Sequence, residues 1–411
     1  MRQLNLPAFD RRLDPTFDQP VAVAVSGGGD STYALAATAD WARAHGRPVI
    51  ALGVDHRLQA ASAAWLDAAE ATAVGLGAAF IRLAWVGEKP ATGLAAAARR
   101  ARHALVAEAA RTAGASVVVF GHTADDRAEA ALMRGWGLRV GDPREWAPSP
   151  VWPEGRGVFV LRPLLSLRRA AIREALTARG LGWIEDPANE DPRQPRARAR
   201  RALGAAGRLP SSTACADDAA PLARAATVQA ASIRLERAAF ATGAAGRALG
   251  AALLCVGGGE RPPRGEKLAA LLDRVAGGAS FTATLAGAKL VAGGDVLIVR
   301  NAGEVARGGL ASAPLDVGRP IVWDGRFALS ATRPGLSVAP MRGLASRLAK
   351  AQLGALAAIP AVARPALPVI VAHDGAVTCP ILAGNAEVEA VDLTVGRFFA
   401  ASGAVSKEPR A

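Results

Sequence analysis

Cysteine is scarce in this chain of 411 residues, which contains only Cys215, Cys255 and Cys379. No CxxC pair or other metal-ligand spacing occurs, which argues against a disulfide framework, a zinc ribbon and a cysteine-held iron–sulfur cluster. No uncharged apolar run reaches about 18 residues, and residues 1–17 contain no apolar signal core, so neither a membrane span nor a secretory signal is predicted. We therefore expect a cytoplasmic protein without a membrane partner.

Lysine is also rare, since five of the 49 basic residues are Lys and the other 44 are Arg. With 36 acidic residues the net charge is +13, which favours a polyanionic partner such as a nucleic acid. The charge alone is weak evidence, because arginine use also follows genomic base composition. The hydrophobic share of 51% excludes general disorder, and the length suggests two or three domains.

Short apolar runs alternate with helical stretches between Val21 and Trp136. The predicted strands are 21–25, 48–54, 78–84 and 116–121, and the predicted helices are 30–44, 60–74, 93–111 and 124–136. A strand-like run at 159–165 and a helix at 167–179 close this region. Strands without polar alternation, separated by helices, predict an α/β fold whose parallel sheet is covered on both faces.

The rest of the chain has a different pattern. Pro, Gly and Trp mark 137–157 as a long loop, and 204–213 resembles a linker. The segments 216–256 and 264–276 are predicted to be helical, 281–301 to form a β-hairpin, and the last part to contain short strands. The sequence therefore predicts three domains: 1–205, a mainly helical domain at 214–301 that ends in the hairpin, and a small α+β module at 318–411.

The sharpest signal is a buried strand that runs into a glycine-rich loop and then a helix, at Ser26-Gly27-Gly28-Gly29-Asp30-Ser31. The glycines let the backbone turn tightly, and the helix N-terminus offers N–H groups and a partial positive charge. The loop lacks the Lys of GxxxxGK[ST] and the acidic partner of a dinucleotide fingerprint. It predicts a phosphate or pyrophosphate site with Ser26 and Ser31 as hydroxyl donors, and Asp30 as either a helix cap or a Mg²⁺ ligand.

Six motifs in register resemble those of the PP-loop ATP pyrophosphatases, and in particular the tRNA(Ile)-lysidine synthase family. They are SGGGDS (26–31), VDHRL (54–58), GHTADDRAE (121–129), LMR (132–134), RPLL (162–165) and WIEDPAN (183–189). The resemblance is strong over residues 20–205 and extends over 206–411 only in layout. It implies an adenine nucleotide alpha-hydrolase-like N-terminal domain and tRNA contacts in both C-terminal parts.

The reaction of that family joins the ε-amine of free L-lysine to carbon 2 of the wobble cytidine in the CAU anticodon of tRNA(Ile). ATP adenylates the carbonyl oxygen of the base, which turns a poor leaving group into AMP, and pyrophosphate is released. The resemblance therefore implies an enzyme, a carbon–nitrogen ligase that uses ATP and Mg²⁺ and makes lysidine.

The resemblance also places roles on particular residues. Nucleotide binding falls to Ser26, Gly27, Gly28, Gly29, Asp30, Ser31, Val54, Asp55, His56 and His122. The expected catalytic set is Asp30 with Asp125, Asp126 and Glu129, which start a helix after a strand. Because the lysine ammonium must be gripped and deprotonated before attack, we expect the last three acids to recognise lysine and to accept its proton. Ordinary enrichment of acids at a helix start is the alternative explanation.

Arginine-rich segments supply the expected RNA contacts. Arg99 and Arg102, at i,i+3, would meet the AMP phosphate or the anticodon backbone, and five arginines lie within 193–201. Guanidinium forks suit phosphate groups, although a solvated helix face would have the same pattern. The predicted tRNA-binding residues are Arg99, Arg102, Arg134, Arg196, Arg198 and Arg200.

The chain departs from the family pattern at Arg127 and Ala130, where Gln and Thr are usual, and a glycine-rich stretch after them is replaced. A tRNA thiolase is disfavoured because no Cys precedes Cys215. An amide-forming synthetase would need an ammonia supply, for which no glutaminase-type Cys region is found. An inactive tRNA-binding paralogue should have lost loop or acidic residues, and none is missing. The sequence leaves the oligomeric state open, a homodimer included.

Overall fold

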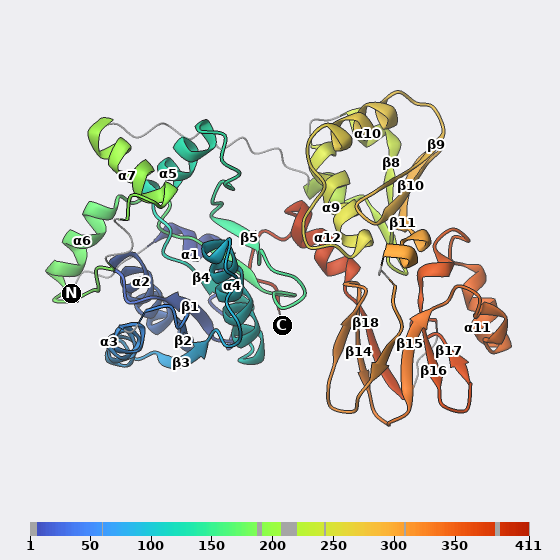
Figure 1. Cartoon of the computed structure of the whole chain (residues 1–411), viewed down its shortest axis with the longest axis horizontal. Helices are drawn as coiled ribbons and strands as arrows, with labels where there is room; N and C mark the ends of the chain where they lie inside the picture. The colour runs from blue at the N-terminus through green and yellow to red at the C-terminus, as the bar shows by residue number, and fades with distance from the viewer. Residues whose placement is uncertain are drawn as a thin grey trace. The chain divides into compact units, whose positions relative to one another are not determined.

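The computed structural model describes residues 6–59, 61–186, 191–206, 220–241, 244–307, 310–382 and 387–410. The chain forms two compact units (Figure 1): unit 1 consists of Met1–Cys215 and Ser406–Ala411, and unit 2 of Ala216–Val405. Among the described residues, no helix has the length and apolar character that a bilayer crossing requires. Most of the predicted linker at 204–213 lies outside the described residues.

Unit 1 is built on a six-stranded sheet with the strand order β3-β2-β1-β4-β6-β5. The strands are β1 (Val21–Val25), β2 (Val49–Asp55), β3 (Ala79–Ala84), β4 (Val117–Val119), β5 (Trp146–Pro148) and β6 (Phe159–Leu161). All pairs are parallel except β5 with β6. The predicted parallel sheet is confirmed, and the one addition is β5, which lies within the segment expected to be a loop.

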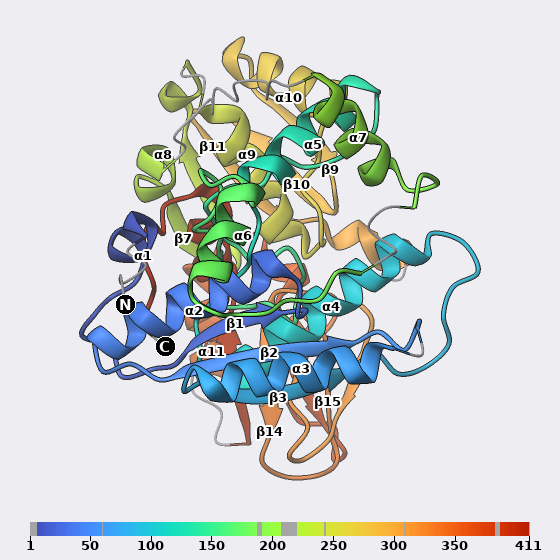
Figure 2. The same ribbon diagram turned by 90° about the vertical axis from the view of Figure 1, so that its left-hand side faces the viewer.

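Helices cover both faces of this sheet. The helices of unit 1 are α1 (Pro7–Arg12), α2 (Gly29–Ala44), α3 (Ser62–Gly75), α4 (Leu94–Thr112), α5 (Ala124–Gly135), α6 (Arg169–Ala178) and α7 (Pro195–Ala206). Val21 and Val23 of β1 belong to the core that contains residues of α2 and α6, whereas Ala22 belongs to the core under α4. Figure 2 shows α2 and α3 lying across the sheet. Burial on both faces explains why β1 is apolar at every position.

The C-terminal tail belongs to unit 1. Glu408 forms a two-pronged ion pair with Arg47 at 2.6 and 2.8 Å, and neither side chain is exposed. The backbone N–H of Asp14 also donates to Glu408, at 3.1 Å. The sequence-based division differs here, because it assigns 318–411 to a single C-terminal module.

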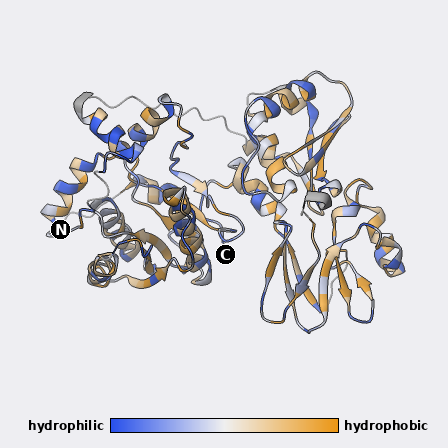
Figure 3. Cartoon of the chain, in the orientation of Figure 1, coloured by the Kyte–Doolittle hydropathy of each residue, from blue (hydrophilic) through white to orange (hydrophobic). Residues whose placement is uncertain are grey.

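Unit 2 contains three antiparallel sheets, with the orders β7-β8-β11-β10-β9, β12-β15-β16-β17 and β13-β14-β18. The strands are β7 (Thr227–Gln229), β8 (Ser232–Glu236), β9 (Phe281–Leu285), β10 (Ala288–Ala292), β11 (Asp295–Arg300), β12 (Ala313–Leu315), β13 (Ile321–Trp323), β14 (Phe327–Ala331), β15 (Leu336–Pro340), β16 (Pro368–Ala372), β17 (Val377–Thr378) and β18 (Val388–Asp392). The helices are α8 (Ala220–Arg224), α9 (Ala245–Gly257), α10 (Glu266–Ala276), α11 (Lys350–Ala357) and α12 (Thr394–Ser402). Figure 3 shows apolar residues along the strands of this unit and a largely hydrophilic α7 in unit 1.

Two local predictions for unit 2 need correction. The helix predicted over 216–256 is wrong for β7 and β8: Ile233 and Leu235 are fully buried, and β8 pairs with β11. Alanine-rich sequence favours helix locally, but the apolar contacts of an alternating strand override that preference. The hairpin predicted over 281–301 is larger than expected, because β9 precedes the β10–β11 hairpin and pairs with β10.

Candidate functional site

The glycine-rich loop connects β1 to α2 at the carboxyl edge of the parallel sheet. Gly27 has a φ of 80°, and its carbonyl oxygen accepts a hydrogen bond from the Ile184 N–H at 2.8 Å. A Cβ on Gly27 would lie 2.6 Å from the Ile184 side chain. The hydroxyl of Ser31 donates to the Gly28 carbonyl at 2.9 Å and accepts from the Ser26 N–H at 3.2 Å. The loop is therefore held in one shape by contacts inside and behind it.

The N-terminus of α2 has no side-chain cap, because the N-cap residue is Gly28. Its first N–H groups are thus available to an external acceptor, which together with the helix dipole favours an anion. Gly29 packs against Trp183, whose side chain a Cβ would meet at 3.4 Å. The segment 183–184, predicted as part of a family motif, supports the loop from behind, whereas 187–189 of that motif lie outside the described residues.

The segment after β4 lies directly against the start of α2. A Cβ on Gly121 would lie 2.4 Å from the carbonyl oxygen of Asp30. The segment after β4 and the first turn of α2 therefore lie backbone against backbone, which brings the helix-start acids of α5 close to the loop.

Four carboxylates and one arginine meet at this point. The guanidinium of Arg169, the first residue of α6, contacts Asp30 at 3.0 Å, Glu129 at 3.3 Å and Asp126 at 3.5 Å. Its backbone N–H donates to Asp125 at 2.8 Å. All four acids of the predicted catalytic set are thus brought together, and the residue that joins them was not predicted.

The acids differ in what already engages them. Asp125 accepts from the backbone at the start of α6, and Asp126 forms a capping box with Thr123 at the start of α5. Glu129 is almost fully buried; its Oε1 accepts from Arg200 at 2.9 Å, while Oε2 has no hydrogen-bond partner among the described residues. A buried carboxylate oxygen without a partner is costly, so Glu129 is the acid best prepared to receive a donor.

The electrostatics of the cluster follow from burial and charge. Burial raises the pKa of Asp30 above its usual value, even though Arg169 acts in the opposite direction. For Arg169, burial would lower the pKa, but the negative charges of Asp30, Asp126 and Glu129 outweigh it and the pKa is raised. The guanidinium therefore stays charged.

A second cluster nearby is cationic. Burial lowers the pKa of Arg102 and of Arg162 to about 10, and that of His103 to about 2. The pKa of His122 is well below its usual value because of burial and the neighbouring arginines. Each of these four residues has a buried nitrogen that meets no hydrogen-bond partner within the described ranges: Arg102 Nε, His103 Nε2, His122 Nδ1 and Arg162 Nε.

Arg99 belongs to this cationic cluster, since burial and the charge of Arg196 lower its pKa. Crowded positive charges with unused donors are the chemistry of an anion site. The predicted residues Arg99, Arg102 and His122 are thus brought together. Arg162 and Arg169 were missed as site residues. For Arg169 one signal was present, because a cation at a helix N-terminus opposes the helix dipole.

The end of β2 is shaped by Asp55, whose carboxylate accepts from the Arg57 N–H at 2.7 Å and the Ser62 hydroxyl at 2.8 Å. Burial alone would raise the pKa of Asp55, but these hydrogen bonds outweigh it and the pKa is lowered. His56 lies edge-on to Trp85, with ring centroids 6.3 Å apart. The carboxylate of Asp55 therefore stabilises the turn that follows β2. Val54 is still part of β2 and pairs with Leu83 of β3.

Besides Arg99 and Arg102, the four other predicted RNA-binding arginines divide into two groups. On α7, Arg200 and Arg196 face the acids, with Arg196 3.8 Å from Asp126. Arg198 instead donates to backbone carbonyls of the preceding loop at 3.3 and 3.5 Å, and Arg134 lies 3.4 Å from Asp142.

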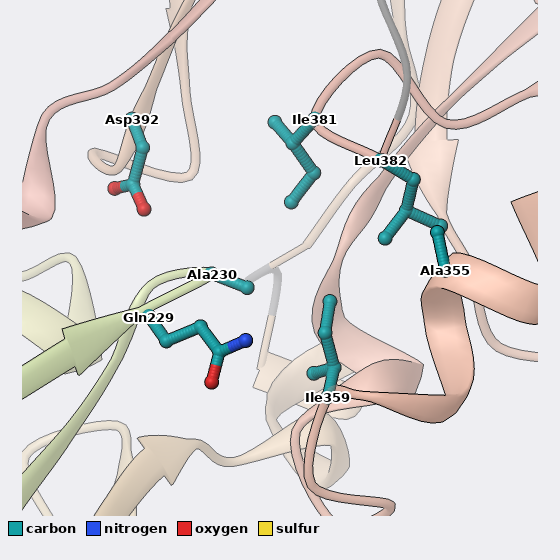
Figure 4. Close-up of a pocket in the computed structure, with 7 residues that line it drawn as sticks. All are labelled: Gln229, Ala230, Ala355, Ile359, Ile381, Leu382 and Asp392. Carbon is teal, nitrogen blue, oxygen red and sulfur yellow. The ribbon is translucent and has the colours of Figure 1, made fainter.

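A cavity of about 310 Å³ lies in unit 2 (Figure 4). It is lined by Gln229, Ala230, Ala355, Ile359, Ile381, Leu382 and Asp392. The Asp392 carboxylate accepts from the N–H groups of Ala231 and Thr394, both at 2.8 Å. Its oxygens are engaged in local structure and the other walls are largely apolar, so this cavity lacks the clustered charges found in unit 1.

A parallel sheet whose first strand ends in a glycine-rich loop, with anion-binding groups and acids at the same edge, defines a PP-loop domain. A family model described as a PP-loop domain matches residues 6–206. A tRNA(Ile)-lysidine synthase of Caulobacter vibrioides is 50% identical over 407 residues, which cover 98% of this chain and 97% of the relative. The enzyme of the same name from Hyphomonas neptunium is 38% identical, covering 69% of this chain and 83% of the relative. The chain belongs to the tRNA(Ile)-lysidine synthase family.

Proposed function

We propose that this chain joins L-lysine to carbon 2 of the wobble cytidine in the CAU anticodon of tRNA(Ile), with conversion of ATP to AMP and pyrophosphate. The observation that carries the proposal is the juxtaposition, at one sheet edge, of an anion site and a carboxylate site. The reaction needs both, because it combines a polyphosphate with an amine that arrives as an ammonium ion. Substrate tRNA and free lysine place this activity in the cytoplasm.

The loop 26–31 and the N-terminus of α2 bind the two terminal phosphates of ATP. Three features support this assignment: the uncapped helix start, the left-handed Gly27, and the nearby arginines, of which Arg102 and Arg162 each keep a buried Nε without a partner among the described residues. A preorganised set of donors stabilises charge that develops on the α-phosphate as the oxygen of the base attacks.

Mg²⁺ fits the same place. Within the described part of the chain, no group of three or more His, Cys, Asp or Glu side chains is arranged to hold a metal by itself. Mg²⁺ usually takes only one or two carboxylates and completes its coordination with phosphate oxygens and water, so Asp30 is a suitable protein ligand. Bound there, Mg²⁺ would neutralise phosphate charge.

The acids of α5 handle the lysine substrate. Glu129 Oε2 accepts the ammonium, and Asp126 adds negative charge beside it. The ammonium of lysine has a pKa of about 10.4, so it must lose a proton before its nitrogen attacks carbon 2. The orphaned oxygen of Glu129 is the acceptor within this cluster that has room for that role.

Unit 2 and the arginines of α7 that do not face the acids, such as Arg198, contact parts of the tRNA other than the reacting base. The net charge of +13 supports a polyanionic partner. Among the alternatives, tRNA thiolation stays disfavoured, because no Cys precedes Cys215.

The decisive experiment incubates the chain with ATP, lysine and a CAU-anticodon tRNA, and then analyses the nucleosides by mass spectrometry. Lysidine is expected, and it should disappear in Asp30→Ala together with AMP release. Asp67→Ala is the matched control, because Asp67 is an exposed acid that pairs with Arg82 on the surface. Wild-type turnover by Asp30→Ala would contradict the loop assignment, and a product without lysine would contradict the reaction.

A further inference from the structure

Arg169 occupies the carboxylate site that the proposed reaction reserves for a substrate cation. Its guanidinium reaches three acids from two helices, Asp30 at the start of α2 and Asp126 and Glu129 on α5. Only 18% of the Arg169 side chain is exposed. The guanidinium of Arg169 therefore occupies the position at which the proposed reaction requires the ammonium of lysine.

The backbone of Arg169 is fixed, so any rearrangement is confined to its side chain. Its N–H donates to Asp125, and Ile172 and Leu176 anchor α6 in the core. The arginine side chain, by contrast, has several rotatable bonds, each with alternative staggered rotamers. It can leave the acids while the helix stays in place.

One carboxylate oxygen of the cluster, Oε2 of Glu129, is available to an incoming cation. Glu129 Oε2 is buried and has no hydrogen-bond partner in the part of the chain that the structure describes, whereas Oε1 is already shared by Arg169 and Arg200. An ammonium that binds Oε2 comes within a few ångströms of the Arg169 guanidinium, and like charges at that range repel. The two cations therefore compete for one set of carboxylates.

We propose that Arg169 is a gating residue: its guanidinium fills the lysine site in the substrate-free protein and is displaced when lysine binds. This inference rests on the proposed function. Lysine binding is then an exchange of one cation for another. The affinity for lysine is reduced by the free energy that Arg169 gains from its ion pairs with the acids. In return, the acids keep a cation partner until the substrate arrives.

The test compares the KM for lysine in the wild type and three variants, with ATP and tRNA saturating. Arg169→Gln removes the competing charge and should lower the KM for lysine by about tenfold, within the usual range of coupling between sites. Arg169→Lys keeps a cation and should retain a KM within about twofold of the wild type. Arg173→Gln, one turn further along α6, is the matched control, because its side chain is half-exposed and pairs with Glu185.

A second measurement uses the unmodified protein, in case Arg169→Gln fails to fold. Lysine should increase the reaction of Arg169 with phenylglyoxal, followed by peptide mass mapping, while modification of Arg173 stays constant. An unchanged or raised KM in folded Arg169→Gln, or protection of Arg169 by lysine, would overturn the gate. If the wild type makes lysidine, such a result refutes the gate alone; if it makes none, the proposed function itself fails.

Discussion

Replacing Gly121 by alanine should displace the backbone at the start of α2, next to the glycine-rich loop. The added methyl would lie 2.4 Å from the Asp30 carbonyl oxygen, 2.6 Å from its carbonyl carbon and 2.9 Å from the Ser31 nitrogen. All three are backbone atoms, so rotation of a side chain cannot relieve the overlap. Restoring ordinary contact requires the first turn of α2 to move by about 1 Å.

Two effects of different size follow from that shift. Overpacking of this kind costs roughly 1–3 kcal/mol of folding free energy, which leaves most molecules of a stable domain folded. Misplacement of a catalytic group by about 1 Å can lower the rate by about 10²-fold. Gly121→Ala should therefore reduce kcat/KM for tRNA-dependent AMP release by about 10²-fold while the protein remains folded.

The assay measures AMP release with tRNA and lysine, alongside the thermal unfolding of each protein. Gly135→Ala is the control, because Gly135 ends α5 and an added Cβ would meet nothing within 4 Å. That change should leave activity intact and stabilise the helix by up to about 1 kcal/mol. Wild-type kcat/KM in Gly121→Ala would refute the reasoning, since it would mean that the loop tolerates displacement.

Two further predictions concern stability. Glu408→Gln should destabilise unit 1 by about 3–5 kcal/mol, because it leaves the charge of Arg47 buried and unpaired; faster hydrogen exchange of the β1 amides would report it. The control is Glu387→Gln, which removes the partner of Arg333 in an exposed ion pair and should lower the free energy of unfolding by less than about 1 kcal/mol. Equal losses of stability in the two variants would contradict the argument. Burial lowers the pKa of His103 to about 2, against 6.5 when unfolded. The unfolded chain therefore binds a proton that the folded chain excludes, so stability falls as the pH drops below 6.5, by about 2 kcal/mol at pH 5. His103→Gln should remove about 2 kcal/mol of this loss in urea unfolding measured at pH 5 and pH 7, whereas the loss due to His122, whose pKa is also lowered, should remain.

Local sequence was enough to determine the strand–loop–helix unit at 26–31 and the parallel sheet around it. Apolar runs without polar alternation can be satisfied only by burial on both faces, and three consecutive glycines after such a run mark a tight turn. The acids of α5 were found in the same way, since their spacing along one helix is visible in the sequence.

Tertiary structure alone decided which groups meet those residues. Arg169 reaches Asp30 across 139 positions of sequence, and Glu408 reaches Arg47 across 361. Strands β7 and β8 form for a similar reason, because Ile233 gains its burial from pairing with β11 rather than from neighbouring residues. Spacing and propensity describe what a chain segment prefers by itself, whereas long-range ion pairs and buried contacts exist only after the segments have packed together.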